Sequence, residues 1–422
     1  MLTLSTLRFR LVPLAALVLV LAACDSGEGS SLYDPDAETG PAPVISSVTP
    51  DGVVLAGIDV ITIQGQNFSD DPALNTVVFD DATGNAANGE ILSASTSRLE
   101  VRTPNLPNPA LRVRVAVVGA QDYSNAVSLP LSPAFARVES LDPNREESPR
   151  ALGNGIDGSL YVTLYVEGAA AGILRFGPDG ARSTYSTEGT LWTGLAPVAG
   201  GSLFGVRQNR GVYLIPEGGT SDVTVRDIPS GNTLRDVVAI GDGMFWTGGT
   251  NTNVAARALY RFTADGTVTA TVPFEEPVTS LAAAAGALYV ASVTTDAGSV
   301  VDSKVWRFPL TADGLGDGEV LLDLVSEFGT GVGANAIALA ADGTVFVATN
   351  AADPLLTISP DGEATTLYPG ILPSPLVDLA WGMGSELYVL QGLTAAEVES
   401  PTGGLLDLFR VQVRTPGPYA ES

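Results

Sequence analysis

A repeated unit of about 42 residues constrains the fold of this chain more than any other feature. Each unit holds a run of small apolar residues, a turn, an aromatic-containing strand and, further on, a third strand. The aromatic position recurs at intervals of 43, 41, 44, 57 and 42 residues, at Tyr161, Phe204, Phe245, Tyr289, Phe346 and Tyr388. A nearly constant period of this length is typical of repeat architectures, and the long interval indicates an insertion in one unit.

The unit predicts a four-stranded propeller blade. Small residues suit the innermost strand because inner strands converge on the axis, and Asp-Gly pairs such as that in "ADGTVFVATN" (341–350) suit tight hairpins. The sixth unit lacks a fourth strand after "DLFRVQV" (407–413). We therefore expect "AFARVESL" (134–141) to complete this blade and close the ring, which removes exposed strand edges. A five- or seven-bladed ring and an array of β-sandwiches are the alternatives.

The units resemble six-bladed propellers of the NHL and gluconolactonase-like type. They lack the Gly-His signature of WD40 repeats, since the chain has no histidine, and they show no kelch-like double glycine with a period near 50 residues. The fold class that we predict is all-β, with a β-sandwich at residues 43–131 followed by a six-bladed β-propeller at residues 132–422.

The sandwich is predicted from at least five short strands separated by turn residues. The stretch resembles the IPT/TIG family of immunoglobulin-like domains, most clearly in "ITIQGQNF" (61–68) and "VRTPN" (101–105). Gly65 and Asn67 are expected to take positive φ in a turn while Phe68 packs into the sandwich. The resemblance implies a spacer or binding module without catalytic residues. Four arginines are expected on solvated strand faces, namely Arg98, Arg102, Arg112 and Arg114.

The N-terminus predicts a lipoprotein. Residues 1–23 form a signal peptide, with two arginines and then an apolar stretch too short for a confident membrane span. The end, "LAAC", resembles the bacterial lipoprotein signal, which implies that Cys24 is acylated; a plain secretory signal is the alternative. Cys24 is the only cysteine, so no disulfide can form within the chain. Residues 24–42 read as a flexible tether. We expect the cell envelope, with the outer membrane or cell surface favoured over the inner membrane.

Charge and composition exclude several function classes. The net charge of −26 argues against nucleic acid as a partner. The absence of histidine removes Ser-His-Asp and Cys-His catalysis and His-ligated zinc. Any chemistry must use carboxylates, amides, hydroxyls or a metal ion bound by oxygen.

The resemblance to gluconolactonase-like propellers suggests one candidate metal site. "ESPRALGNG" (147–155) resembles the opening motif of that family and "NAIALAADG" (335–343) its asparagine motif. The implied ligands are Glu147, Asn335 and Asp378, a set of oxygen donors that suits Ca²⁺. Ala336 replaces the usual glycine, and the middle blades offer only Asp236. Surface-loop or turn-capping roles and a structural ion are the alternatives, and our expectation is that no cofactor is required.

The leading functional prediction is a lipid-anchored binding or scaffold protein without catalysis. A metal-dependent lactonase-like hydrolase and a surface glycan-binding protein are the alternatives. For glycan binding, Trp192, Trp246, Trp306 and Trp381 could stack on sugars, although such residues are more often core. For a protein partner, the insertions 293–304 and 392–404 are expected to be long loops, where binding residues concentrate.

Overall fold

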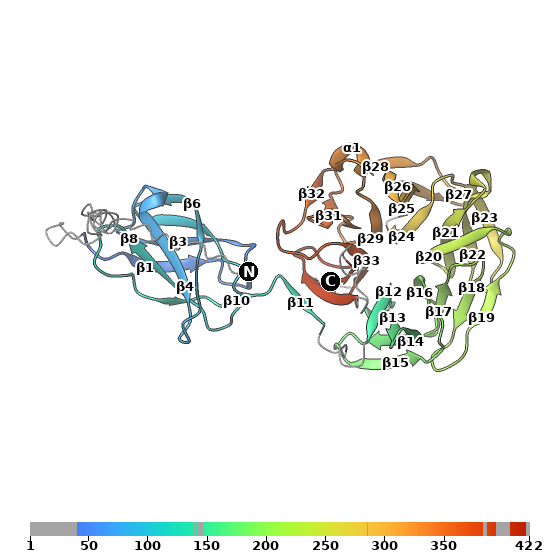
Figure 1. Cartoon of the computed structure of the whole chain (residues 1–422), viewed down its shortest axis with the longest axis horizontal. Helices are drawn as coiled ribbons and strands as arrows, with labels where there is room; N and C mark the ends of the chain where they lie inside the picture. Colours follow the sequence, from blue (N-terminus) through green and yellow to red (C-terminus); the bar gives the residue numbers. More distant parts are fainter. Residues whose placement is uncertain are drawn as a thin grey trace, which may run out of the picture.

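The computed structural model describes residues 40–138, 141, 147–284, 286–382, 386–393 and 406–418. Within them the chain is almost entirely β, with one short α-helix, α1 (Leu324–Phe328), and two 3-10 turns, η2 (Pro72–Leu74) and η4 (Val254–Ala256). A sandwich and a ring of six sheets lie side by side (Figure 1), which confirms the predicted fold class. The predicted signal peptide, Cys24 and most of the tether lie outside the described residues. None of the helices in the described ranges has the length and apolar character needed to span a bilayer.

Two four-stranded antiparallel sheets form the sandwich. In spatial order they are β1 (Val44–Thr49), β3 (Val60–Gln66), β7 (Arg98–Arg102) and β6 (Glu90–Ser95), and β5 (Ala86–Asn88), β4 (Asn75–Asp80), β8 (Arg112–Val117) and β9 (Val127–Ser128). β2 (Val54–Leu55) and β10 (Leu131–Ser132) add a short parallel pair. Alternate residues such as Ile61, Ile63, Val77 and Phe79 are buried between the sheets, as the period of two along a strand requires.

The turn after β3 is confirmed in part. Asn67 takes a positive φ of 61°, and Phe68 is buried in the sandwich core. Gly65 does not take a positive φ, so that part of the prediction is wrong. Glycine is needed there for a different reason, because a Cβ atom at this position would lie 2.0 Å from the Val44 carbonyl oxygen on the neighbouring strand.

Six blades surround the axis, each with its first strand innermost (Figure 1). Blade one is β12 (Ser148–Asn154), β13 (Leu160–Val166), β14 (Ala169–Phe176) and β15 (Arg182–Ser186). Blade two is β16 (Gly194–Pro197), β17 (Leu203–Val206), β18 (Val212–Ile215) and β19 (Asp222–Val225). Blade three is β20 (Asn232–Gly241), β21 (Met244–Asn251), β22 (Ala258–Thr263) and β23 (Val268–Pro273). Blade four is β24 (Val278–Ala284), β25 (Ala287–Asp296), β26 (Ser299–Thr311), β27 (Gly314–Leu315) and β28 (Glu319–Asp323). Blade five is β29 (Ala334–Leu339), β30 (Val345–Thr349), β31 (Leu355–Ile358) and β32 (Ala364–Thr366). The recurring aromatic lies on the second strand of every blade.

The sixth blade closes the ring with strands from both ends of the propeller. It consists of β33 (Leu376–Trp381), β34 (Glu386–Gln391), β35 (Asp407–Gln412) and β11 (Phe135–Arg137). β11 pairs antiparallel with β35, with Phe135 opposite Val411, and Arg137 forms an ion pair with Asp407. The predicted closure by the segment before the first unit is confirmed.

The insertion at 293–304 is not a loop, so that expectation is wrong. It lengthens β25 and β26 into a hairpin that turns at Ala297 and Gly298, which have φ of 46° and 84°. Consecutive positive φ values form the tight turn that continues the strand twist, so the alternating residues on either side pair instead of looping out. The insertion at 392–404 lies mostly outside the described residues.

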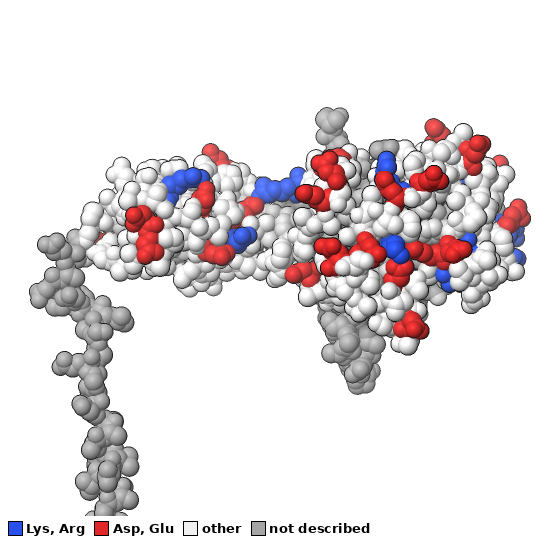
Figure 2. All heavy atoms as spheres, turned by 90° about the horizontal axis from the view of Figure 1, so that it is seen from above, with Lys and Arg blue, Asp and Glu red and all other residues white. Residues whose placement is uncertain are grey.

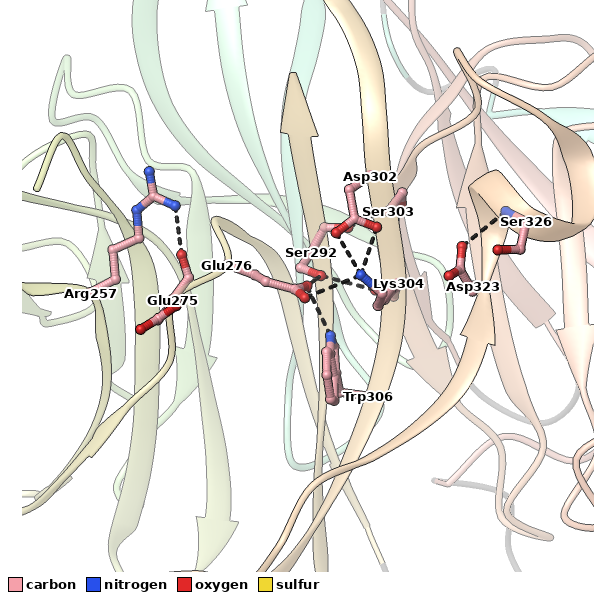
Figure 3. A network of polar contacts seen from close by, with 10 residues as sticks. All are labelled: Arg257, Glu275, Glu276, Ser292, Asp302, Ser303, Lys304, Trp306, Asp323 and Ser326. Atoms are coloured by element: carbon pink, nitrogen blue, oxygen red, sulfur yellow. Dashed lines mark hydrogen bonds and ion pairs between the residues drawn. The ribbon is translucent and has the colours of Figure 1, made fainter. Parts of the chain in front are cut away.

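A cluster of charged side chains fixes the base of this hairpin (Figure 3). Lys304, the single lysine of the chain, lies 2.5 Å from an Asp302 oxygen and 3.4 Å from a Glu276 oxygen. The Trp306 indole N–H donates to the same Glu276 carboxylate at 3.0 Å. Glu276 precedes the inner strand of blade four, so these contacts tie the hairpin to the rest of its blade.

The sandwich and the propeller share a hydrophobic interface beside blades five and six. Leu55 of the sandwich belongs to the core cluster that also contains Tyr368 and Leu372, and Ile58 and Ile371 pack against that cluster. At the edge of this contact the Arg414 guanidinium forms an ion pair with Asp59. The sandwich is therefore held against the propeller by contacts on both domains as well as by the connecting chain.

Candidate ligand site on the propeller axis

A cavity of about 500 Å³ follows the propeller axis. Its wall consists mainly of the six inner strands, and residues from both ends of β12, Arg150 and Asn154, line it. The cavity stays open because many of the inner-strand side chains that line it are small, such as the alanines of blades four and five. About half of the cavity surface is polar. Cavities of this size are typical of small-molecule sites.

Five of the six inner strands carry a β-bulge at the same position. The pairing with the second strand skips one residue in each of these blades, namely Arg150, Arg235, Thr279, Asn335 and Val377. All five line the cavity. A bulge adds an unpaired residue to one strand and re-aims its side chain. The five bulges therefore place one extra side chain per blade on the cavity wall.

A bulge interrupts the backbone hydrogen bonds between two strands, and at each of the five bulges a side chain accepts a hydrogen bond from the backbone N–H that is left unpaired. The amide two residues beyond each bulged residue donates to an acidic or hydroxyl side chain. Asp236 accepts the N–H of Val237 at 2.8 Å and that of Leu281, in the next blade, at 2.7 Å. Asp378 accepts those of Leu379 at 2.8 Å and Leu152 at 2.7 Å. Both carboxylates thus join neighbouring blades.

The remaining bulge is completed by a serine. Ser280 accepts the N–H of Ile337 from blade five at 3.3 Å and donates to Asp236 at 3.2 Å. Gly194, at the matching place in blade two, leaves room for the same carboxylate, since a Cβ there would lie 2.5 Å from an Asp236 oxygen. This polar layer links blades two to five around Asp236 and Ser280.

Burial raises the pKa of both carboxyl groups. The pKa of Asp236 rises to about 6 and that of Asp378 to about 7, because protein surrounds each group and disfavours the charged form. The hydrogen bonds that both carboxylates accept from backbone N–H groups lower these pKa values in part. The negative charge of Asp236 raises the pKa of Asp378 further. The cavity reaches both side chains, which are therefore partly exposed to its interior.

The three predicted ligand residues do not meet at one point. Asn335 and Asp378 both line the cavity. Glu147 is not part of its wall; it is buried and receives two hydrogen bonds from Arg182, at 2.7 and 2.9 Å. The motif that contains Glu147 contributes a different residue to the cavity wall, namely Arg150, three positions further on.

The donors on the cavity wall do not fit a divalent cation. Both oxygens of Asp378 accept backbone N–H groups, and the Asn335 amide donates to the Leu376 carbonyl at 2.7 Å. Hard cations require several free oxygen donors, whereas this wall also carries two arginines. In the described part of the chain, no group of three or more acidic or cysteine side chains could hold a metal ion. We therefore derive no chemistry through a metal.

Sequence reasoning missed Arg150 and Arg235, although a signal for them exists. Alignment of the inner-strand motifs places "RAL" (150–152), "RDV" (235–237) and "NAI" (335–337) in register. The position of Asn335 is therefore occupied by arginine in two other blades. Asp236 and Asp378 occupy the next position of the same motif.

Comparison with known proteins identifies the first domain. Residues 43–130 match the IPT/TIG domain. The four arginines expected on its strand faces all lie in ion pairs: Arg98 with Glu100, Arg102 with Glu90, and Arg112 and Arg114 with Asp80. Arg98, Arg102 and Arg112 are exposed as expected, whereas Arg114 is half-buried.

No curated protein matches the chain in sequence. Among solved structures, the calcium-binding protein regucalcin from Agrobacterium tumefaciens aligns with 66% of this chain and 96% of its own, at 17% identity and a TM-score of 0.47. A gluconolactonase from Xanthomonas campestris aligns with 66% and 88%, at 13% identity and a TM-score of 0.46. A protein of unknown function from Bacteroides thetaiotaomicron aligns with 92% and 91%, at 13% identity and a TM-score of 0.36. These likenesses concern the fold, and the printed functions belong to those proteins.

Proposed function

We propose that the chain is a lipid-anchored cell-envelope binding protein that takes a small ligand in the axial cavity without turning it over. In this proposal Cys24 carries the lipid, the IPT/TIG domain is a spacer, and the propeller is the binding module. The cavity carries the proposal, because it combines a volume of about 500 Å³ with polar groups from several blades.

The absence of turnover is argued from the carboxylates. A general base needs an oxygen within reach of the substrate proton. Asp236 and Asp378 direct both of their oxygens at backbone N–H groups of their own and neighbouring blades. Because the chain has no histidine, no imidazole can take that role. The acidic groups of the cavity are thus engaged in holding the ring together.

The test of this function has two arms. Calorimetry with Ca²⁺ and Mg²⁺ and a hydrolysis screen with aldonolactones should show neither tight metal binding nor turnover. The membrane anchor is tested separately by fatty-acid labelling in a bacterial host, where label should be incorporated into the native chain and be absent from Cys24→Ala. Metal-dependent hydrolysis would contradict the binding function, and unlabelled native chain would contradict the anchor.

A lactonase-like hydrolase is the second candidate, for one specific reason. The pKa of Asp378 is raised to about 7, close to the value that suits a general base at neutral pH. In that case hydrolysis should be lost in Asp378→Asn and should follow the titration of one carboxyl group. The hydrogen bonds from Leu152 and Leu379 favour the structural role instead.

A further inference from the structure

We propose that the ligand of the axial cavity is a small organic oxyanion, which Arg150 and Arg235 bind through their guanidinium groups. This inference rests on the proposed binding function and gives it a ligand class. Guanidinium groups match carboxylate, sulfate and phosphate oxygens, because their planar N–H donors can form paired, charge-assisted hydrogen bonds.

The first observation is that neither arginine forms an ion pair in a strongly acidic protein, although the charge of Arg235 is one of the influences that lower the pKa of the adjacent Asp236. The chain has 47 acidic residues against 21 basic ones, and acidic side chains form patches scattered over the face that Figure 2 shows. Within the described ranges, three arginines make no hydrogen bond and no ion pair to a protein group: Arg150, Arg210 and Arg235. Arg210 is exposed, whereas the other two are partly buried and line the cavity. Water solvates Arg210 freely, but a partly buried cation needs a counter-charge.

The second observation is how the two side chains are positioned. Both are the bulged residues of their inner strands, in blades one and three, so they enter the cavity at the same level of the ring. The Arg150 guanidinium carbon lies 4.7 Å from the centre of the Tyr165 ring. Stacking on an aromatic ring fixes a guanidinium plane without using its N–H donors. The Arg150 Nε atom is buried and has no hydrogen-bond partner, so the donors that this side chain can offer a ligand are its two terminal nitrogens.

The third observation is that the neutral polar side chains at this level direct donors toward backbone carbonyls. Thr279 donates to Ala334 at 2.7 Å, Thr193 donates to Val206 at 3.3 Å, and the Asn335 amide donates to Leu376. Among the described residues of the wall, the donors without a hydrogen bond to protein are the guanidinium groups, the Gln208 amide and the indole N–H groups of Trp192 and Trp381. The two indole N–H groups are buried, so the guanidinium groups are the charged donors that a ligand can reach. A ligand held here must therefore be rich in acceptors, and the two positive charges favour an anion.

Asp236 and Asp378 oppose such a ligand when they are ionised. Among the described residues of the wall, they and the two arginines are the titratable groups. Burial raises the pKa of both carboxyl groups, so at mildly acidic pH they are largely neutral and the cavity is positively charged. As the pH rises through the pKa values of about 6 and about 7, negative charge develops beside the ligand. Binding of an oxyanion should therefore weaken from pH 5.5 to pH 8.

The test is calorimetric titration of the full chain at low ionic strength and pH 5.5. D-glucuronate, inorganic sulfate and inorganic phosphate are the anionic probes, and D-glucose is the uncharged control. We expect saturable binding of at least one anionic probe and none of D-glucose. Arg150→Gln and Arg235→Gln should each weaken binding about tenfold or more, since each removes a charge-assisted interaction. Arg210→Gln, the matched control, should bind as the native chain does.

The outcomes separate this inference from the proposed function. Equal binding of D-glucose and D-glucuronate, or full binding by the Arg150→Gln and Arg235→Gln double variant, would overturn the oxyanion while leaving a binding protein. Failure of all three anionic probes to bind would also overturn it. Hydrolysis of an aldonolactone would instead overturn the non-catalytic function. Circular dichroism and melting curves establish that each variant is folded before its affinity is compared.

Discussion

Two neighbouring positions in blade one handle charge in opposite ways. Glu147 is buried in a two-point ion pair with Arg182, and its charge is neutralised by protein. Arg150, three residues later, reaches the axial cavity without any ion pair in the described structure. The chain has acidic residues in excess, so a counter-ion for Arg150 would be easy to supply. In our proposal, charge at the periphery serves stability, whereas cationic charge at the axis binds the ligand.

Breaking the peripheral pair tests the stability side of this comparison and should give the largest effect. In Glu147→Gln the Arg182 guanidinium would lose its carboxylate partner in a setting where the Glu147 side chain is 2% and that of Arg182 is 27% exposed. We expect a loss of about 3 kcal/mol in the free energy of unfolding, because removing one member of a buried pair leaves an uncompensated charge. Urea unfolding followed by fluorescence measures this. Asp317→Asn, at an exposed acid, should change stability by less than about 0.5 kcal/mol.

The same variant distinguishes a structural glutamate from a metal ligand. Ligand binding at the axis should be unchanged in folded Glu147→Gln, since Glu147 does not line the cavity. Abolished binding in a fully folded variant would show that the two regions are not separate.

The carboxylates of the cavity should contribute less per residue than the peripheral pair. Asp378→Ala leaves the N–H groups of Leu152 and Leu379 without their acceptor. An unsatisfied buried donor costs about 1–3 kcal/mol, but water in the cavity can replace part of the lost contact, so we expect a loss of about 2 kcal/mol. Thermal unfolding should show it. An unchanged melting temperature would mean that the bulge amides do not depend on Asp378.

The fold could be predicted from the sequence because each repeated unit corresponds to one blade of the propeller. The recurring aromatic marks the second strand of each blade, and the missing sixth outer strand correctly predicted that residues 135–137 close the ring. The hairpin at 293–304 was misjudged because a long interval between repeats was taken for a loop. Its β-branched valines and threonines and its Ala297-Gly298 turn already favoured strands.

The site was less readable because it depends on bulges. A bulge is a defect in the pairing of two strands, and neither strand alone encodes it clearly. Asn335 and Asp378 were found through a family resemblance, whereas Arg150 and Arg235 occupy the position of Asn335 in other blades and were missed. The same resemblance selected Glu147, which the structure pairs with Arg182. Alignment of the repeats with one another would have been the better guide to this wall.

The pH dependence of stability sharpens the comparison further. In the folded protein the pKa values of Asp236 and Asp378 lie at about 6 and about 7, above the ordinary aspartate value of 3.8. Between about pH 4 and pH 7 the folded state therefore binds more protons than the unfolded state, so stability falls as the pH rises and levels off above pH 7. The native chain should melt at a lower temperature at pH 8 than at pH 5.

Other acidic groups with shifted pKa values do not alter the predicted pH dependence of stability between about pH 4 and pH 7. The pKa values of Asp157, Glu188 and Asp265 are lowered in the folded protein, so their contribution is present at higher pH and is lost only as the pH falls below about 4. A variant with both Asp236→Ser and Asp378→Ser should show a flatter dependence between pH 5 and pH 8. An equally steep dependence in that variant would place its origin elsewhere.

The smallest effect on stability should come from the axial arginines, and it is the most direct test of the contrast. Arg235 makes no hydrogen bond or ion pair in the described structure, so Arg235→Gln breaks no such contact and removes only the favourable effect of its charge on the Asp236 carboxylate. We expect a change of less than about 0.5 kcal/mol, or a slight gain, because a partly buried cation without a partner is costly to the folded state. Arg182→Gln, at the paired arginine of blade one, is the control and should destabilise clearly, since it leaves Glu147 buried and charged. If both variants lost a comparable amount of free energy of unfolding, Arg235 would be stabilised by a contact within the protein. Charge at the axis would then serve stability, as it does in the Glu147–Arg182 pair.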